Sequence, residues 1–448
     1  MHLAASVSGM SDRVDAVVIG AGVIGSSVAL ELARGCRSVI VVDKGAAAGA
    51  GSTSSSSSII RFSYSTADAV LTAWEAAAMW TDWAGHLGYV DPDGMAQFVR
   101  TGMCIFRTPG DNTARVERLW DDLGIAYHVL GADELQRRLP GMDLGAYFPP
   151  KPIDDPAFAD DATGRLTAII EDESGFIDDP MLAARNLAHA AQQHGAQFRF
   201  HQEVTSIDRS AGTAGTGSRV SGVTLASGEQ IVAPIVVNVA GPHSGIVNRL
   251  AGVTEGMRIG HRPLRQEVFT VAAPAGLRLT DGMPAVADLD IGQYIRPQIG
   301  GTWLVGGTEP ACDQLHWIAD PDHFDEYPTV EQFEVSMMRI ARRVPDFGVP
   351  HRPVGLAALY DASDDWVPIY DKSDLPGYFM ACGTSGNQFK NAPIAGQFMR
   401  AIIDAEAAGI DHDEHPVQFP GTRTGRTINL GAFSRRRAKS ETSGTVMG

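Results

Sequence analysis

Apolar and polar positions form their clearest pattern near the start of the chain, between residues 15 and 44. A fully apolar run, Ala16 to Ile19, is followed by the glycine-rich stretch GAGVIG and then by apolar positions with helical spacing. A second apolar run, Val39 to Val42, ends at Asp43. Short apolar runs bounded by turn residues are typical of buried strands. The pattern predicts a strand, a glycine turn, a helix and a second strand.

The same succession of strand, glycine turn and helix returns far along the chain. The stretch YFMACGTSGNQFKNAPIAGQFMRAIIDA places Gly383 and Gly386 between an apolar run and a helical pattern. Another apolar run, Ile235 to Val239, closes on a glycine turn at Gly241. We expect the three segments to reach one common site.

Further elements are predicted between these segments. We expect helices over 68–88 and 329–343, a helix and a turn over 113–139, and a helix followed by a strand over 175–208. Residues 96–107 alternate like a strand, and 264–310 carry several strand-like runs. The serine-rich stretch 49–65 runs into an apolar Ile-Ile pair, which a flexible linker rarely does. The polar residues 411–448, which contain three consecutive arginines, predict a mostly mobile tail.

Each part of the first unit has a role in binding a dinucleotide. Gly20 permits a tight turn, Gly22 lets the backbone approach a pyrophosphate, and Gly25 lets helix and strand pack closely. The N–H groups at the helix start attract phosphates. Asp43 lies 18 positions after Gly25, where its carboxylate can accept hydrogen bonds from ribose hydroxyls. A nicotinamide dehydrogenase needs one such unit, whereas a chain that returns to the site with a second glycine turn indicates a flavoprotein.

Composition and charge narrow the class of protein. A chain of 448 residues is expected to form more than one domain. A net charge of −17 disfavours nucleic acid and anionic membranes as partners, and no apolar run is long enough to span a membrane. The four cysteines are widely spaced, which suits a reducing compartment and argues against a metal site. We expect a cytoplasmic protein that acts on a small molecule and binds no metal.

The motifs together resemble the amine-oxidising flavoproteins of the D-amino-acid oxidase superfamily. The resemblance covers about residues 14–410 and rests on GAGVIGSSVALELA with VVDK, STSSSSSIIRFSY, VVNVAGPHS, and GLAALYDASDDWVPIYD running into ACGTSGNQFKNAPIAG. The branch that the chain is most similar to contains monomeric sarcosine oxidase and N-methyltryptophan oxidase, with glycine oxidase as a cousin.

This resemblance implies an α/β fold with two domains. One is a Rossmann-like FAD-binding domain of the glutathione-reductase type, and the other is a mixed-sheet α+β substrate domain. The FAD-binding domain is expected to be discontinuous, over 14–95, 163–256 and 352–410. The substrate domain is expected over 96–162 and 257–351, with terminal extensions at 1–13 and 411–448.

The resemblance also implies how FAD is held. Residues of the first glycine turn would meet the pyrophosphate, the end of the second strand would meet the adenosine, and the second glycine turn would line the flavin ring. The family's tethering cysteine is replaced by Ala358, so the FAD is expected to be non-covalent. The expected cofactor-binding residues are Gly20, Gly22, Val23, Ile24, Gly25, Asp43, Lys44, Ser52, Thr53, Ile60, Val204, Gly241, Gly383, Ser385, Gly386, Asn387, Gln388, Phe389 and Lys390.

Two basic residues give the clearest indication of the substrate class. In the sarcosine oxidase branch, the arginine after "II" and the lysine after the last "GxxF" hold the substrate carboxylate, and here they are Arg61 and Lys390. An arginine can grip a carboxylate with two hydrogen bonds, while a lysine adds a point charge. The alternative is that Arg61 forms a structural salt bridge and Lys390 is an ordinary helix-start side chain.

The remaining active-site positions depart from the family pattern. Tyr294 matches a tyrosine that covers the substrate, and Thr308 replaces an active-site histidine. Leu304 replaces a lysine that promotes the reaction with oxygen, which puts a fast oxygen reaction in doubt.

The resemblance favours an FAD-dependent oxidase of the C–N bond of an N-substituted glycine or related secondary amino acid. Hydride transfer to flavin would give an imine that hydrolyses to an amine and an aldehyde or glyoxylate, and O₂ would be reduced to H₂O₂. The reaction could serve catabolism or the biosynthesis of an unusual amino acid. Two alternatives stay open, a dehydrogenase with another electron acceptor and a flavin-binding subunit of a heteromeric complex. The chain itself is expected to be a monomer or a homodimer.

Overall fold

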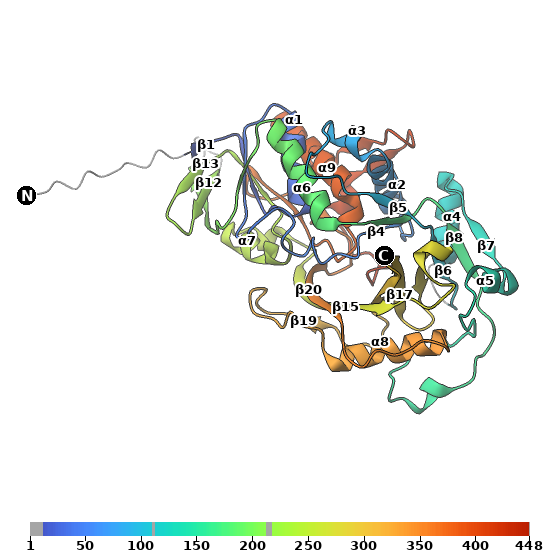
Figure 1. Ribbon diagram of the computed structural model, residues 1–448. Coiled ribbons are helices and arrows are strands. Elements are labelled where there is room, and N and C mark those ends of the chain that lie inside the picture. Colours follow the sequence, from blue (N-terminus) through green and yellow to red (C-terminus); the bar gives the residue numbers. More distant parts are fainter. Residues whose placement is uncertain (1–11, 110–112, 212–216, 448) are drawn as a thin grey trace, which may run out of the picture.

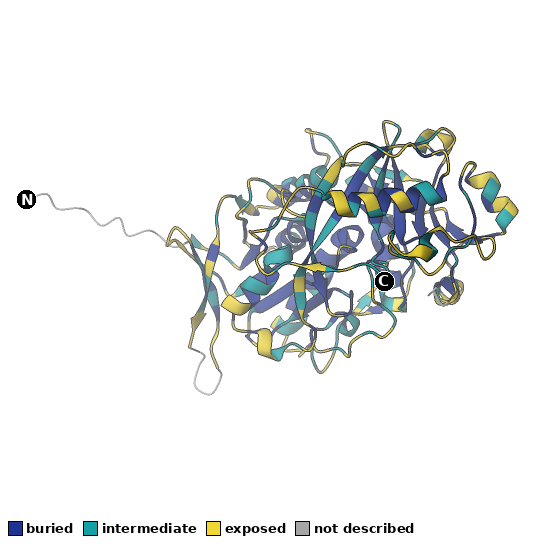
Figure 2. Cartoon of the chain, turned by 90° about the horizontal axis from the view of Figure 1, so that it is seen from below, coloured by how far each residue is buried: buried dark blue, intermediate teal, exposed yellow. Residues whose placement is uncertain are grey.

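Two large β-sheets and the helices packed on them make up most of the protein (Figure 1). The computed structural model describes residues 12–109, 113–211 and 217–447. Buried residues concentrate in the sheets and the helices between them, whereas exposed residues follow the outer loops (Figure 2). Residues 1–11 of the predicted N-terminal extension lie outside the described part of the chain. Within that part, no helix has the length and hydropathy that crossing a membrane requires.

The first sheet, called here the parallel sheet, has the strand order β10-β3-β2-β14-β22-β21. All neighbours are parallel except β21, which runs antiparallel to β22. The carboxyl ends of parallel strands lie at one edge of a sheet, so the turns after β2, β14 and β22 gather there. The predicted meeting of three distant segments is confirmed. The strands are β2 (Ala16–Ile19), β3 (Val39–Val42), β10 (Gln197–Arg199), β14 (Ile235–Asn238), β21 (Ile369–Lys372) and β22 (Tyr378–Cys382).

Three helices pack together against this sheet: α1 (Val23–Arg34), α6 (Pro180–Gln193) and α9 (Ala392–Ala407) (Figure 1). Almost every residue of α1 is buried, because α6 and α9 flank it. Gly396 of α9 permits this approach, since a Cβ there would lie 2.4 Å from the Ser27 carbonyl oxygen. The glycine turn that starts α1 is therefore held by a packed helix layer.

The second large sheet, the mixed sheet, has the order β19-β15-β18-β17-β16-β6-β8-β7, and β20 pairs with residues 261–269 of β15. Its strands are antiparallel except for the β6 and β16 pair. Helix α8 (Val330–Arg343), predicted over 329–343, buries Phe333, Met337 and Ile340 in the core of this sheet. The strands are β6 (Met103–Phe106), β7 (His128–Leu130), β8 (Ala168–Glu171), β15 (His261–Ala272), β16 (Ala285–Asp288), β17 (Gln293–Gln298), β18 (Thr302–Gly307), β19 (His316–Trp317) and β20 (Gly355–Ser363).

Smaller elements fill the space around the two sheets. One small sheet pairs β1 (Asp12–Arg13), β13 (Gln230–Val232), β12 (Arg219–Leu225) and β11 (Val204–Ser210), so the last two residues of the predicted N-terminal extension are a strand. Another pairs β4 (Ile59–Ile60), β9 (Gly175–Ile177) and β5 (Phe98–Arg100). The other helices are α2 (Ala67–Thr81), α3 (Trp83–Leu87), α4 (Thr113–Leu123), α5 (Ala132–Arg138) and α7 (Ser244–Leu250). Short 3-10 turns are η1 (Pro156–Ala159), η2 (Gly241–His243), η3 (Thr254–Gly256), η4 (Leu279–Asp281), η5 (Phe389–Asn391) and η6 (Leu430–Phe433).

Two predicted elements are divided in the structure. The helix expected over 68–88 breaks at Asp82, whose carboxylate accepts a hydrogen bond from the Gly85 N–H at 3.1 Å and so starts α3. The strand expected over 96–107 breaks into β5 and β6 near Gly102, which has φ +74°. Each break comes from a single residue within the apolar pattern, the polar Asp82 in the first case and Gly102 in the second.

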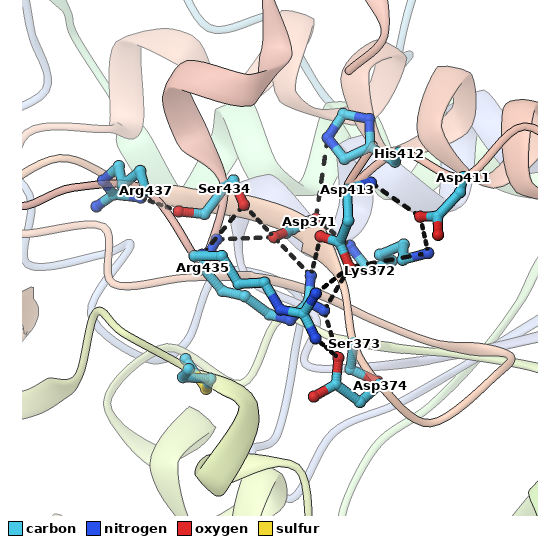
Figure 3. Close-up of polar contacts among 12 residues, drawn as sticks. Asp371, Lys372, Ser373, Asp374, Asp411, His412, Asp413, Ser434, Arg435 and Arg437 are labelled. Atoms are coloured by element: carbon cyan, nitrogen blue, oxygen red, sulfur yellow. Dashed lines mark hydrogen bonds and ion pairs between the residues drawn. The ribbon is translucent and has the colours of Figure 1, made fainter. Parts of the chain in front are cut away.

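The prediction of a mostly mobile tail after residue 410 is wrong. Strands β23 (Gln418–Pro420) and β24 (Thr427–Asn429) pair with each other, and Ile428, Leu430 and Phe433 join the main core. Arg435 is fully buried among three acidic residues, Asp371 at 3.0 Å, Asp374 at 2.6 Å and Asp413 at 2.8 Å (Figure 3). The arginines of this segment are thus internal ion-pair partners, and their acids lie too far away in sequence for the polar pattern to reveal them.

We expect Arg435→Ala to lower the free energy of unfolding by about 3–5 kcal/mol, because it leaves buried carboxylates without their cation. The matched control is Arg436→Ala, whose side chain is 48% exposed although it pairs with the same Asp374. An exposed ion pair contributes about 0–1 kcal/mol. Denaturant unfolding of both variants measures the difference, and equal losses would contradict the role given to Arg435.

Candidate active site

A deep cavity of about 770 Å³ opens at the edge of the parallel sheet where its glycine turns gather. Its wall combines the first glycine turn, the serine-rich loop, the segment after β14, strand β20 and the second glycine turn. Most of the predicted site residues lie on this wall, including Arg61 and Tyr294. The predicted cofactor residues on it are Gly20, Gly22, Val23, Ile24, Gly25, Asp43, Lys44, Ser52, Thr53, Val204, Gly241, Gly386, Asn387, Gln388, Phe389 and Lys390.

Four predicted residues lie elsewhere. Ile60 is fully buried in the core. Gly383 and Ser385 lie behind the wall, where their N–H groups donate to Asp361 at 2.6 and 2.7 Å and fix the second glycine turn. Thr308 lines a second cavity of about 340 Å³. The structure therefore does not bring Thr308 to the main cavity.

The glycines of the first turn serve different purposes. Gly20 has φ +109°, and a Cβ there would lie 2.4 Å from the Val239 carbonyl oxygen. A Cβ on Gly25 would lie 2.0 Å from the Gly20 carbonyl oxygen. Gly22 has an ordinary φ of −66°, and its added Cβ would meet only Thr53 Oγ1, at 3.2 Å. The protein itself requires Gly20 and Gly25, whereas Gly22 keeps a place in the cavity wall free of side-chain atoms.

Polar contacts fix the loops around this turn. Asp43 accepts hydrogen bonds from the N–H groups of Ala21 and Gly45, both at 2.6 Å, so its carboxylate ties the turn to the end of β3. Thr53 Oγ1 accepts from the Val23 N–H at 3.1 Å, which fastens the serine-rich loop to the start of α1. Lys44 Nζ lies 2.9 Å from His243 Nε2 at the cavity wall and also pairs with Asp322.

Arg61 and Lys390 come together although they are far apart in sequence. Their side chains are 4% and 3% exposed. Arg61 donates to Ser63 Oγ at 3.1 Å and lies 4.6 Å over the Tyr64 ring. Lys390 Nζ donates to Tyr64 Oη at 3.0 Å and to the Asn387 carbonyl at 2.6 Å, and lies 5.4 Å from the same ring. The two basic groups thus flank Tyr64, which lines the second cavity and not the main one.

No carboxylate of the described residues forms an ion pair with Arg61 or Lys390 within 4.0 Å, which rules out the structural salt bridge considered above for this part of the chain. Burial lowers the pKa of Arg61, and burial together with the charge of Arg61 lowers the pKa of Lys390 well below its usual value. Buried charges without counter-ions are costly, and a bound anion relieves the cost. The pair therefore combines two buried basic groups that have no acidic partner among the described residues.

The opposite wall comes from the mixed sheet. Tyr294 of β17 shares a hydrogen bond of 2.7 Å with Ser57 Oγ, and burial raises its pKa to about 12, so the phenol stays protonated. Ala358 of β20 lines the cavity, whereas Cys382 is fully buried in β22, with its sulfur 3.7 Å from His261 Nε2. Cys382 is therefore a core residue and not part of the cavity wall.

Sequence reasoning missed four residues at or near the site. Tyr64 separates the two cations, and Val446 and Met447 reach the cavity from the segment predicted as a tail. Glu309, which follows Thr308, lines the second cavity, and Met447 lies on the walls of both cavities. Tyr64 lies within the motif STSSSSSIIRFSY and could have been noticed, whereas no local signal in the sequence marks Val446, Met447 or Glu309.

Comparisons with known proteins agree with this geometry. The chain is 24% identical to "FAD-dependent oxidoreductase domain-containing protein 1" of Xenopus laevis, over 96% of this chain and 83% of that protein. It is 23% identical to glycine oxidase of Geobacillus kaustophilus, over 90% and 96% of the two chains. The fold matches the crystal structure of L-proline dehydrogenase from P. horikoshii with a TM-score of 0.70 at 19% identity, over 90% and 95% of the chains. The family model "DAO: FAD dependent oxidoreductase" matches residues 15–402, and the chain therefore belongs to this family of FAD-dependent oxidoreductases.

Proposed function

We propose that this protein oxidises the C–N bond of an N-substituted glycine or a related secondary amino acid. The observation that carries the proposal is the pair of buried cations, Arg61 and Lys390, without an acidic partner in the wall of the main cavity. A carboxylate is the commonest anion that an arginine and a lysine bind together. The similarity to a glycine oxidase over most of both chains supports an amino acid as the carrier of that carboxylate.

The main cavity fits FAD. Gly22 leaves room for a pyrophosphate beside the backbone, because no protein atom but Thr53 Oγ1 lies within 4 Å of its absent Cβ. The start of α1 offers N–H groups and the positive end of the helix dipole to phosphates. Asp43 and Lys44 would lie at the adenosine end and residues 386–390 at the flavin ring. When bound, FAD would supply the acceptor for a hydride, and with it the two electrons, from the carbon next to the substrate nitrogen.

The chain's own residues supply position and environment. Arg61 and Lys390 would hold the carboxylate, which fixes the neighbouring C–N bond in one orientation. Tyr294 stays protonated and hydrogen-bonded to Ser57, so it presents a fixed, neutral wall to the substrate. The imine product would hydrolyse to an amine and an aldehyde or glyoxylate after leaving this dry site. O₂ would take up the electrons as H₂O₂.

Leu304 favours a second candidate function, that of a dehydrogenase with another electron acceptor. It occupies the position on β18 where the sarcosine oxidase branch carries an oxygen-activating lysine. The yield of H₂O₂ per substrate oxidised separates the two functions: a yield near one supports the oxidase, and a yield near zero supports the dehydrogenase.

Gly22→Val should abolish FAD binding and leave the apoprotein folded, because the side chain would fill the space beside the backbone without striking the protein core. Flavin content and circular dichroism measure the two effects. The control is Gly348→Val, since Gly348 also has an ordinary φ and open space but lies outside the cavity wall. Normal flavin content in Gly22→Val would mean that another part of the chain holds the pyrophosphate.

The FAD should be released by acid precipitation, because Ala358 offers no sulfur for a covalent link and Cys382 is buried behind the wall. The expected result is a yellow supernatant whose flavin co-migrates with authentic FAD in chromatography. Flavin that stays with the precipitated protein would reveal a covalent bond.

Arg61→Ala and Lys390→Ala test the proposed function directly. Each should lower kcat/KM for an N-substituted glycine by an amount equal to about 2–4 kcal/mol, the scale of removing one partner of a buried charge pair. The loss should be much smaller for the corresponding amine that lacks the carboxylate. Steady-state kinetics with both compounds give the comparison.

The control for this experiment is Arg262→Ala, an exposed arginine outside the cavity that should leave both rates unchanged. Flavin content and the melting temperature establish that each variant is folded and loaded. Equal losses for the acid and the amine would contradict a carboxylate-binding role.

A further inference from the structure

The backbone of Val446 lies between Arg61 and a buried acid, Glu309. Its carbonyl oxygen accepts a hydrogen bond from Arg61 Nη2 at 2.5 Å, and Asn387 Nδ2 lies 3.4 Å from the same oxygen. Its N–H donates to Glu309 Oε2 at 3.0 Å. One residue thus presents a nitrogen donor to the acid and an oxygen acceptor to the arginine, with a single Cα between them. An α-amino acid carries the same two groups at the same spacing.

Glu309 uses only one of its two carboxyl oxygens in a hydrogen bond to the described residues, as a group that awaits a ligand would. Its second carboxyl oxygen, Oε1, is buried and has no hydrogen-bond partner among the described residues. Its backbone has φ +51°, an uncommon conformation for a residue with a side chain. Burial and then the nearby charge of Asp313 raise its pKa to about 8. A buried, unpaired carboxyl oxygen is costly unless a ligand completes its hydrogen bonds.

The segment that carries Val446 is anchored away from the cavity. The ion pairs of Arg435 (Figure 3) and the pair of Arg437 with Asp365 at 2.7 Å hold residues 434–437. Beyond them the chain runs to Val446, which packs with Leu264, Ala362 and Trp366. The contacts of residues 445–447 with the two cavities are therefore separate from the anchor, so that losing these contacts would leave the ion pairs of residues 434–437 intact.

We propose that Arg61 and Glu309 form a matched receptor for the carboxylate and the amine of an α-amino acid, and that Val446 occupies this receptor until a substrate displaces it. The inference rests on the proposed function and narrows the substrate class to α-amino acids, in which the oxidised amine lies one carbon from the carboxylate. Glu309 becomes the residue that recognises the amine. The second cavity, which Glu309 lines, then receives an apolar substituent, since Ile105, Val116, Phe148 and Leu289 form much of its wall.

A trio of compounds of equal shape tests this receptor in the FAD-loaded protein. α-Aminoisobutyrate has both groups and cannot be oxidised, because its amine-bearing carbon carries no hydrogen. Pivalate replaces the amine with a methyl group, and tert-butylamine replaces the carboxylate with a methyl group. Dissociation constants are measured from the change in flavin absorbance for the full chain, for a chain ending at Gly444, for Glu309→Gln and for the two changes combined.

Removal of residues 445–448 should tighten binding of α-aminoisobutyrate by roughly tenfold or more, because the ligand no longer competes with Val446. In the shortened chain, Glu309→Gln should weaken α-aminoisobutyrate by about tenfold, the difference between a charge-assisted and a neutral hydrogen bond, and leave pivalate nearly unchanged. The amine without a carboxylate should bind most weakly throughout. If shortening the chain prevents folding, Val446→Pro in the full chain removes the N–H that donates to Glu309 and should also tighten binding of the amino acid.

Two results would overturn the inference: affinities that neither the shortened chain nor Val446→Pro changes, or equal weakening of α-aminoisobutyrate and pivalate by Glu309→Gln. Failure to bind any of the three compounds would do the same. Oxidation assays keep the two proposals apart. If N-substituted glycines are oxidised but Glu309→Gln does not weaken amino acid binding, the proposed function holds and the receptor is wrong. If the protein binds α-aminoisobutyrate selectively but oxidises no N-substituted glycine, the receptor holds and the proposed function is wrong.

Discussion

The burial of Arg61 and Lys390 without a carboxylate partner in the described part of the chain is the constraint on which the site depends. Two like charges beside one tyrosine ring repel each other and have lost most of their water. Serine, tyrosine and backbone oxygens take up their protons, but none of these acceptors carries a negative charge. Such an arrangement is unfavourable on its own and becomes favourable when an anion enters. The preference for acidic ligands that we propose has its physical origin in this unfavourable burial.

The fold keeps these charges in place by bringing distant segments to one sheet edge. Arg61 follows β4, and Lys390 lies in the turn between β22 and α9. Helix α9 is packed on α1 through Gly396, so the second glycine turn cannot move independently of the first. Asp361 of β20 holds the N–H groups of Gly383 and Ser385, which ties the mixed sheet to the same turn. The two glycine turns and strand β20 of the mixed sheet are thereby fixed relative to one another.

Local patterns in the sequence were sufficient to predict the parallel sheet and its glycine turns, because both depend on short apolar runs. The meeting of Arg61 with Lys390 was predicted from the family resemblance. Features that depend on distant partners could not be predicted. The sequence alone predicts that Arg435 is a solvated charge, whereas in the structure the acids at 371, 374 and 413 surround it. Thr308 matched a motif position but faces the second cavity, since the strand before it directs alternate residues to opposite sides. The contact of Val446 with Glu309 joins residues that no pattern relates.

Selective binding of a simple anion tests the central claim most directly. Propionate and propionamide have nearly the same shape, but only propionate carries a negative charge. Melting temperatures of the FAD-loaded protein are measured against increasing concentrations of each compound at constant ionic strength and pH. The account predicts that propionate raises the melting temperature in a saturable way and that propionamide does not. An equal response to both compounds would show that the buried cations are not an anion site.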